Sequence, residues 1–143
     1  MANYKSLLVL RSFNEQIQKM EGAENIFPLI NLKKVVKKFG DWYEQLEESI
    51  EDLRLDHCYK EGSKIVRDDK GNYQWTAEGE KAFRKAYKEL LNKEIELPSD
   101  FKPLNYYELA MSLPPEFMTQ NPWEVMSEAL SPYYEYKTDF SFS

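Results

Sequence analysis

The sequence predicts a mainly α-helical protein: an antiparallel helical hairpin with a small β-hairpin at its tip, an N-terminal helix, and an extended C-terminal arm with two short helices. One observation is an apolar repeat at alternating steps of four and three residues, the a/d pattern of a helix that packs lengthwise on another. The repeat comprises Leu32, Val36, Phe39, Tyr43, Leu46, Ile50, Leu53 and His57. The other is that six of the seven prolines follow residue 97. We therefore expect a helical domain at 1–97 and a proline-punctuated aromatic arm at 98–143.

Three helices are expected in the helical domain, at about residues 4–20, 29–60 and 77–95. The first carries one broad apolar face, formed by Leu7, Leu8, Leu10, Phe13, Ile17 and Met20. Gly22 and Pro28 separate it from the second helix, because Gly adopts positive φ and Pro disfavours helical backbone in the residue before it. Gly40 lies inside the long second helix at a cost of roughly 1 kcal/mol relative to Ala, so a kink or a close helix contact is expected there.

A β-hairpin is expected at about residues 64–75, with a turn at Asp68-Asp69-Lys70-Gly71. An early Asp and a late Gly are typical of a type I turn closed by a glycine bulge. The acidic residues do not have EF-hand spacing, so no calcium site is expected. Thr76 is suited to cap the third helix, whose apolar face is expected to pack on the repeat of the second. That face comprises Phe83, Tyr87, Leu90 and Leu91.

The C-terminal arm contains two local helix signals. Asn105 and Asn121 each stand three residues before a Glu, as helix-capping residues do, and Pro114 and Pro132 end the two short helices. The terminal aromatic residues could add a strand, lie extended on a partner, or fold back onto the helical hairpin. We expect the arm to bind partner proteins, because aromatic residues are enriched at protein interfaces. The candidate contact residues are Tyr106, Tyr107, Trp123, Met126, Tyr133, Tyr134, Phe140 and Phe142.

The charge distribution argues against a general nucleic-acid binder. The net charge is −6, whereas affinity for nucleic acid comes mainly from neutralising phosphates. Residues 1–40 carry seven Lys and Arg against three Glu, a net charge of +4, and residues 101–143 carry two against six. The basic cluster of Lys33, Lys34, Lys37 and Lys38 is either the solvated face of a helix or a contact for an acidic partner or a phosphate.

No motif for catalysis, cofactor binding or metal binding is present, so we do not expect an enzyme or a small-molecule substrate. His57 and Cys58 are adjacent on one helix and point about 100° apart, so they cannot act together as base and nucleophile. A run of carboxylates follows the exposed side of the long helix, where a solvated face is the ordinary outcome; it comprises Glu44, Glu47, Glu48, Glu51 and Asp52. A single cysteine excludes an intrachain disulfide, and no apolar run approaches the ~18 residues of a membrane span.

The middle of the chain carries a recurring pattern: a helix rich in Glu, an Asp-x-x-Gly-x-Tyr turn, and a second helix ending in Leu-Leu-Asn-x-Glu. The matching segments are Trp42 to Cys58, Asp68 to Tyr73, and Glu80 to Leu97. This pattern resembles small structural and morphogenesis proteins of tailed bacteriophages whose functions are unassigned. The N-terminal helix and the lysine-rich start of the long helix also resemble that group, so the resemblance covers about the first two thirds of the chain. It brings no catalytic residues with it.

The resemblance implies a structural or assembly component of a phage particle, in the head, connector or tail. Such a protein would be made in the cytoplasm of the bacterial host, reside in the virion, and contact other virion proteins and copies of itself. Two alternatives stay open. One is a small acidic adaptor or inhibitor that binds a host or phage enzyme, and the other is an assembly chaperone absent from the finished particle.

Overall fold

The structure is a computed structural model that describes residues 2–115, 117 and 123–136, with the side chains of 123–125 left out. It is mainly helical and contains a small antiparallel two-stranded sheet. The chain forms two compact units: residues 1–40 with 94–143, and residues 41–93 between them in the sequence. This grouping differs from the predicted boundary at residue 97, because residues from both ends of the chain share one core.

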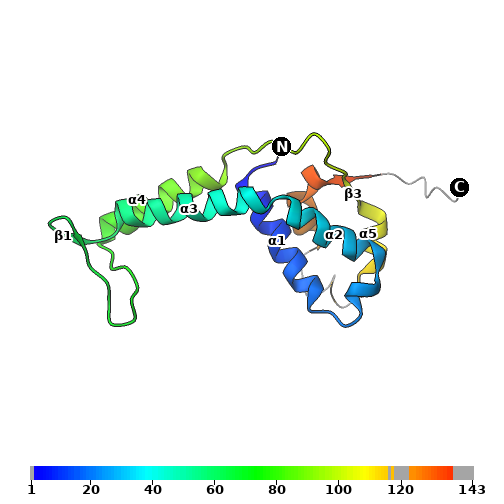
Figure 1. The fold of residues 1–143 in the computed structure, drawn as a ribbon, viewed down its shortest axis with the longest axis horizontal. Helices are drawn as coiled ribbons and strands as arrows, with labels where there is room; N and C mark the ends of the chain where they lie inside the picture. Colours follow the sequence, from blue (N-terminus) through cyan, green and yellow to red (C-terminus); the bar gives the residue numbers. More distant parts are fainter. Residues whose placement is uncertain (1, 116, 118–122, 137–143) are drawn as a thin grey trace, which may run out of the picture. The chain divides into compact units, whose positions relative to one another are not determined.

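The N-terminal part of the first unit consists of α1 (Tyr4–Gln18), the 3₁₀ turn η1 (Ala23–Asn25) and α2 (Phe27–Lys38). The Asn3 side chain accepts a hydrogen bond from the Ser6 backbone N–H, and the Ser6 hydroxyl accepts one from the Asn3 N–H, so a capping box fixes the start of α1. Helix α1 packs against α2 (Figure 1). Their buried apolar residues include Leu7, Leu10, Phe13, Ile17, Leu29 and Leu32.

The C-terminal part of the first unit alternates short helices and strands. Its elements are β3 (Leu104–Asn105), α5 (Tyr106–Ser112), α7 (Trp123–Ala129), the 3₁₀ turn η2 (Ser131–Tyr133) and β4 (Tyr134–Glu135). Strands β3 and β4 are parallel, α5 packs on α2, and α7 packs on α1. The Asn105 side chain caps α5, as predicted, by accepting the N–H of Glu108 at 3.0 Å. The second predicted cap, Asn121, lies outside the described residues.

Tyr133 shows how the two ends of the chain form one core. Its side chain is fully buried, and its ring lies 5.5 Å from Phe39 and 6.4 Å from Phe101, measured between ring centroids. Its hydroxyl lies 2.6 Å from the hydroxyl of Ser6. The described part of residues 98–143 therefore folds back into the first unit and differs from the extended arm that we expected. Burial of large apolar side chains stabilises this packing by about 1.5–3 kcal/mol each.

The expected long helix at 29–60 is two helices in the structure, α2 and α3 (Gly40–His57). The backbone of Phe39 leaves the helical region, with φ −92° and ψ 13°. The Phe39 ring is buried and lies 5.7 Å from that of Phe101. The break coincides with the boundary between the two units, and the low helix propensity of Gly40 lowers its cost.

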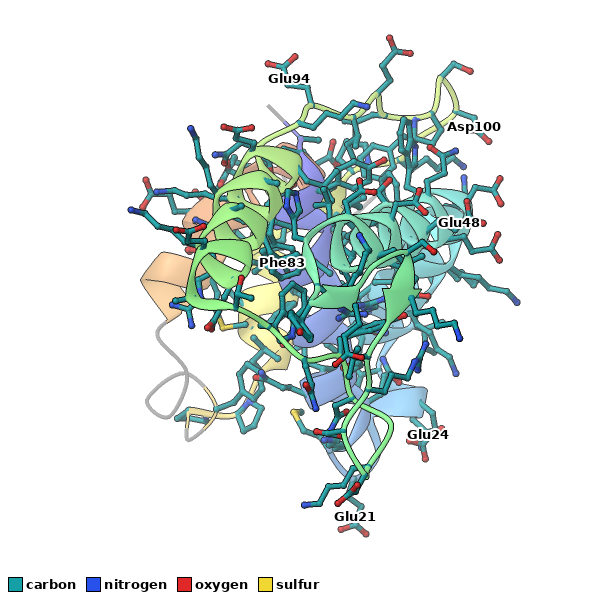
Figure 2. All side chains as sticks on the ribbon, turned by 90° about the vertical axis from the view of Figure 1, so that its left-hand side faces the viewer. Glu21, Glu24, Glu48, Phe83, Glu94 and Asp100 are labelled. Atoms are coloured by element: carbon teal, nitrogen blue, oxygen red, sulfur yellow. The ribbon has the colours of Figure 1, made fainter. Side chains whose placement is uncertain are left out.

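The second unit consists of α3, β1 (Lys60–Glu61), β2 (Lys64–Ile65) and α4 (Ala77–Leu91). Helices α3 and α4 lie side by side and run in opposite directions (Figures 1 and 2). The hydroxyl of Thr76 caps α4 by accepting the N–H of Gly79 at 3.0 Å. A Cβ built on Gly79 would lie 2.5 Å from the carbonyl oxygen of His57, so the end of α3 and the start of α4 approach as closely as glycine allows.

The connection between α3 and α4 contains two turns where we expected one hairpin at residues 64–75. The two-stranded antiparallel sheet pairs Lys60 with Ile65, earlier in the sequence than predicted. The predicted turn segment follows it: Arg67 and Tyr73 form an isolated bridge, and Gly71 has φ +81°. The Tyr73 hydroxyl donates to the carboxylate of Glu51 on α3 and so anchors this second turn.

Candidate functional site

Four tyrosines gather around β3, α5 and β4 of the first unit, and we call them the tyrosine cluster: Tyr106, Tyr107, Tyr134 and Tyr136. Tyr106 lies at their centre, with its ring 5.3 Å from Tyr107, 5.4 Å from Tyr134 and 5.0 Å from Tyr136. Pairing of β3 with β4 brings residues 104–106 beside residues 134–136, although they are about 30 positions apart in the sequence.

The side chains of the tyrosine cluster differ in exposure, from buried at its base to half-exposed at its edge. Tyr134 is buried, which raises the pKa of its hydroxyl well above the usual value. Tyr136 is 52% exposed, and Met111, at the end of α5, is 71% exposed. Tyr107 and Met111 are four residues apart on α5 and so share one helix face. A rigid aromatic base with an exposed apolar edge is the composition typical of protein contact surfaces.

The sequence-predicted contact residues divide into three groups. Tyr106, Tyr107 and Tyr134 come together in the tyrosine cluster. Tyr133 lies instead in the core, where it is not available to a partner, because its ring packs on Phe39 and Phe101. Met126 is half-buried on α7. The side chain of Trp123, as well as Phe140 and Phe142, lies outside the described part of the chain.

Tyr136 and Met111 belong to this surface but were not among the predicted contact residues. A signal for Tyr136 was present, because residues two apart on a strand lie on the same side, and Tyr134 and Tyr136 have that spacing. Met111 carries no such signal, because its exposure depends on how α5 packs against α2.

A pocket of about 490 Å³ lies on the first unit between α2 and the β3–α5 segment; we call it the α2/α5 pocket. Its apolar lining comprises Pro28, Val35, Pro103, Leu104 and Leu109. Its charged lining comprises Lys34, Lys38, Lys102, Glu108 and Glu135, and the amides of Asn31 and Asn105 complete it. Lys38 lies 3.5 Å from the carboxylate of Asp100, and both side chains are exposed; Figure 2 shows Asp100 directed outward.

A second aromatic group lies on the second unit and consists of Trp75, Phe83 and Tyr87; we call it the aromatic edge. The Phe83 ring lies 5.0 Å from Trp75 and 5.8 Å from Tyr87, and all three side chains are half-buried. No residue of α4 is fully buried, although the helix has a strongly apolar face. Two helices alone leave the flanks of their apolar seam open, so this edge is accessible to further packing.

The acidic and aromatic side chains of the turn region are arranged for structure. The hydrogen bond from Tyr73 lowers the pKa of the Glu51 carboxylate, and the same bond raises the pKa of the Tyr73 hydroxyl. The guanidinium of Arg67 lies 4.5 Å above the Tyr73 ring and donates to the Gly71 carbonyl. These contacts close the turn and are partly open to solvent.

His57 and Cys58 lie at the end of α3, where their side chains differ in burial. The Cys58 thiol is buried and lies 3.7 Å from the carbonyl of Leu55, while His57 is half-buried at the end of α3. Among the residues that the structure describes, no group of three or more His, Cys, Asp or Glu side chains could hold a metal ion. None of the helices in the described part of the chain is both long and apolar enough to cross a bilayer.

Comparison with protein-family models, with curated proteins and with solved structures finds no match to this chain.

Proposed function

We propose that this protein is a structural or assembly component of a bacteriophage particle and acts by contacts with other virion proteins. The observation that carries the protein-contact part is the tyrosine cluster, in which the half-exposed Tyr136 packs against Tyr106 and the buried Tyr134. The exposed Met111 lies on α5, the same helix as Tyr106. Pre-organised aromatic side chains bind at low entropic cost, because few rotamers are lost. The phage assignment comes from the sequence pattern between Trp42 and Leu97.

The second unit supports the same proposal from a different part of the chain. Its helical hairpin leaves the aromatic edge half-buried, so a helix from a neighbouring subunit could complete the packing. A protein with two separate contact surfaces can bind two neighbours, and such linking is what assembly of a particle requires.

The test uses particles of the phage that encodes this chain, made with wild-type protein or with the double variant Met111→Ser/Tyr136→Ser. The matched control is Phe27→Ser/Tyr59→Ser, which also removes two exposed apolar side chains, 68% and 38% exposed, from elsewhere on the surface. We expect wild-type and control protein in purified particles, and loss of the cluster variant from them. Circular dichroism of each variant verifies folding. Equal incorporation of both variants would contradict the role of the tyrosine cluster.

The two alternatives predict different outcomes of the same purification. An assembly chaperone would be needed for particle formation yet absent from the finished particle. An acidic adaptor or inhibitor is favoured by α3, which carries seven carboxylates and one arginine, with Glu48 directed outward in Figure 2. Its complex with an enzyme would weaken strongly with salt, because exposed charges are screened.

A further inference from the structure

The helical hairpin of the second unit buries little of its own apolar seam. The structure describes every residue of α3 and α4, and among them only Tyr43 and Leu46 are buried. The half-buried apolar residues that continue the seam include Ile50, Leu53, Phe83, Tyr87, Leu90 and Leu91. A pair of helices with so open a seam lacks a second layer, because stable domains bury such a stripe against further elements.

The aromatic edge lies on one identifiable side of this hairpin. Tyr73 donates to Glu51 of α3, and Trp75, two residues further along the chain, contacts Phe83 of α4. This segment therefore crosses from one helix to the other on the side that Glu51 and Phe83 share. Figure 2 shows Phe83 between the ribbons of the two helices. Tyr87 follows Phe83 on the same helix face, one turn further from the segment, and is half-buried.

The two helices carry opposite charges along this side of the seam. An acidic row on α3 includes Glu51, and a basic row on α4 lies next to Phe83 and Tyr87. The acidic flank consists of Glu44, Glu47, Glu51 and Arg54, and the basic flank consists of Glu80, Lys81, Arg84 and Lys88. Three carboxylates and one guanidinium give the acidic flank a net charge of −2, and three cationic side chains with one carboxylate give the basic flank +2.

The ion pairs of these flanks lie within each helix. Arg54 pairs with Glu51 at 3.4 Å on α3, and Arg84 lies 2.6 Å from Glu80 on α4. Each pair joins two members of the same flank, so the net charge of that flank is unchanged. The side of the hairpin that carries the aromatic edge is therefore apolar along its middle, with an acidic border on α3 and a basic border on α4.

This face is large enough for a specific interface. At a rise of ~1.5 Å per residue, the 15 residues of α4 extend for about 22 Å, and two helices of about 10 Å diameter span about 20 Å. The flat projection of the face is thus about 440 Å², and its side chains raise the accessible area above that value. Two such faces together reach the ~1,000 Å² expected of a specific interface.

A second copy of the same hairpin fits this face. A two-fold rotation about an axis parallel to the helices places α3 of one copy on α4 of the other, with the two running in opposite directions. The acidic flank then meets a basic flank at both contacts, and the half-buried apolar residues fill one core. A two-fold axis across the helices would instead stack α3 on α3, and the two acidic flanks would repel each other.

We propose that two copies of this chain associate through their second units as a four-helix bundle, with α3 of each copy packed on α4 of the other. This inference rests on the proposed function and names the partner at the aromatic edge as a second copy. The bundle uses the aromatic edge and not the tyrosine cluster.

The experiment measures the molar mass of the full-length protein by light scattering across protein concentration at low salt. One variant reverses the basic flank, Arg84→Glu/Lys88→Glu, and another reverses the acidic flank, Glu44→Lys/Glu47→Lys. The matched control is Glu48→Lys/Asp52→Lys, which makes the same change in charge as the second variant at exposed residues of α3 outside the flank. We expect dimers of wild type and control, and dimerisation about tenfold weaker for each flank variant.

The decisive variant combines both reversals in one chain. It exchanges the signs of the two flanks, to +2 on α3 and −2 on α4, so the flanks are complementary again. We expect this combined variant to dimerise like wild type, and an equimolar mixture of the two flank variants to form a heterodimer. Contact with a different protein would not be restored by the exchange, because the charges of that protein stay as they are.

Three results would overturn the proposal: a monomeric wild type at all concentrations, equal weakening in the control, or a combined variant that is folded by circular dichroism and stays monomeric. The Met111→Ser/Tyr136→Ser variant should dimerise like wild type. If wild type is monomeric while that variant is still lost from particles, the dimer proposal falls and the proposed function stands.

Discussion

The hydrogen bond between Ser6 and Tyr133 offers a direct test of how the first unit is held together. The Ser6 hydroxyl donates to the Asn3 carbonyl at 2.7 Å, so its single hydrogen is already used. Tyr133 must therefore donate in the 2.6 Å contact between the two hydroxyls. We consider Tyr133→Phe, Ser6→Ala and the double variant, which together form a double-mutant cycle.

The two single variants are expected to lower the free energy of unfolding by different amounts. Tyr133→Phe removes one hydrogen bond but leaves Ser6 with its partners at Asn3, so we expect a loss of about 1 kcal/mol in the free energy of unfolding. Ser6→Ala removes half of the capping box and leaves the buried Tyr133 hydroxyl without an acceptor, so we expect a loss of about 2–3 kcal/mol. In the double variant that hydroxyl is absent, and the combined loss should fall about 1 kcal/mol short of the sum.

Urea unfolding followed by near-UV circular dichroism measures these losses, and amide hydrogen exchange in α1 assigns them to the first unit. Tyr136→Phe is the matched control, because it removes a hydroxyl from a half-exposed ring in the same unit and should change stability by less than about 0.5 kcal/mol. Strictly additive losses in the cycle, or a Tyr133→Phe variant as stable as the control, would refute the contact and the shared core that depends on it.

Gly79→Ala should destabilise the second unit by about 1–3 kcal/mol in urea unfolding, because the added Cβ would meet the His57 carbonyl. Gly40→Ala is the control: the space around its Cβ is open, so this variant should be more stable than wild type by about 0.5–1 kcal/mol. The opposite order of stabilities would refute the close approach of Gly79 to His57. Burial raises the pKa of Tyr133 to about 12, so the native state holds this proton more tightly than the unfolded chain. This pKa shift should contribute roughly 2–3 kcal/mol to the free energy of unfolding, in full below about pH 10 and progressively less as the pH rises toward 12. Urea unfolding across that pH range measures the contribution, and tyrosinate absorbance follows the titration. A free energy of unfolding that does not change over the range would contradict the prediction. Removal of residues 101–143 should abolish hydrogen-exchange protection in α1, and a truncated chain with α1 still protected would restore the extended-arm interpretation.

The helices were predictable from the sequence because their signals are local. Helix α1 begins at Tyr4 and α4 at Ala77, as the apolar periodicity and Thr76 indicated. The Asn105 cap is equally local, since the side chain and the N–H that it accepts are three residues apart. The C-terminal ends of α1 and α4 lie a few residues before the predicted ends, as is common where fraying and capping compete.

The break at Phe39 illustrates what periodicity cannot decide. A four-three repeat of apolar residues continues across the break, because both helices bury the corresponding faces. The repeat does not report whether the two faces meet one partner or belong to separate packing units. Phe39 satisfies the pattern, yet its ring packs on Phe101 and Tyr133, which are more than 60 residues away.

The tyrosine cluster was predicted in composition but not in geometry. Aromatic enrichment predicted a set of contact residues, and the structure places three of them, Tyr106, Tyr107 and Tyr134, close together. Their role in binding stays a prediction. Their neighbour Tyr133 was misassigned, because alternation along a short strand or turn does not say which side faces the core. That choice depends on the Ser6 hydroxyl and the Phe39 ring, which no local pattern connects with Tyr133.

The charges of the first unit explain why the lysine cluster on α2 had two interpretations in the sequence. Residues 1–40 have a net charge of +4 and residues 94–143 a net charge of −7, so folding them together places basic and acidic segments in one unit. Part of the cluster is thereby used within the chain, as Lys38 is by Asp100. Lys33 and Lys37 stay on the solvated side of α2, while Lys34 faces the α2/α5 pocket. One helix thus carries an internal ion pair, a solvated face and a lysine that lines the α2/α5 pocket, and the register of α2 against β3 and α5 separates these three roles.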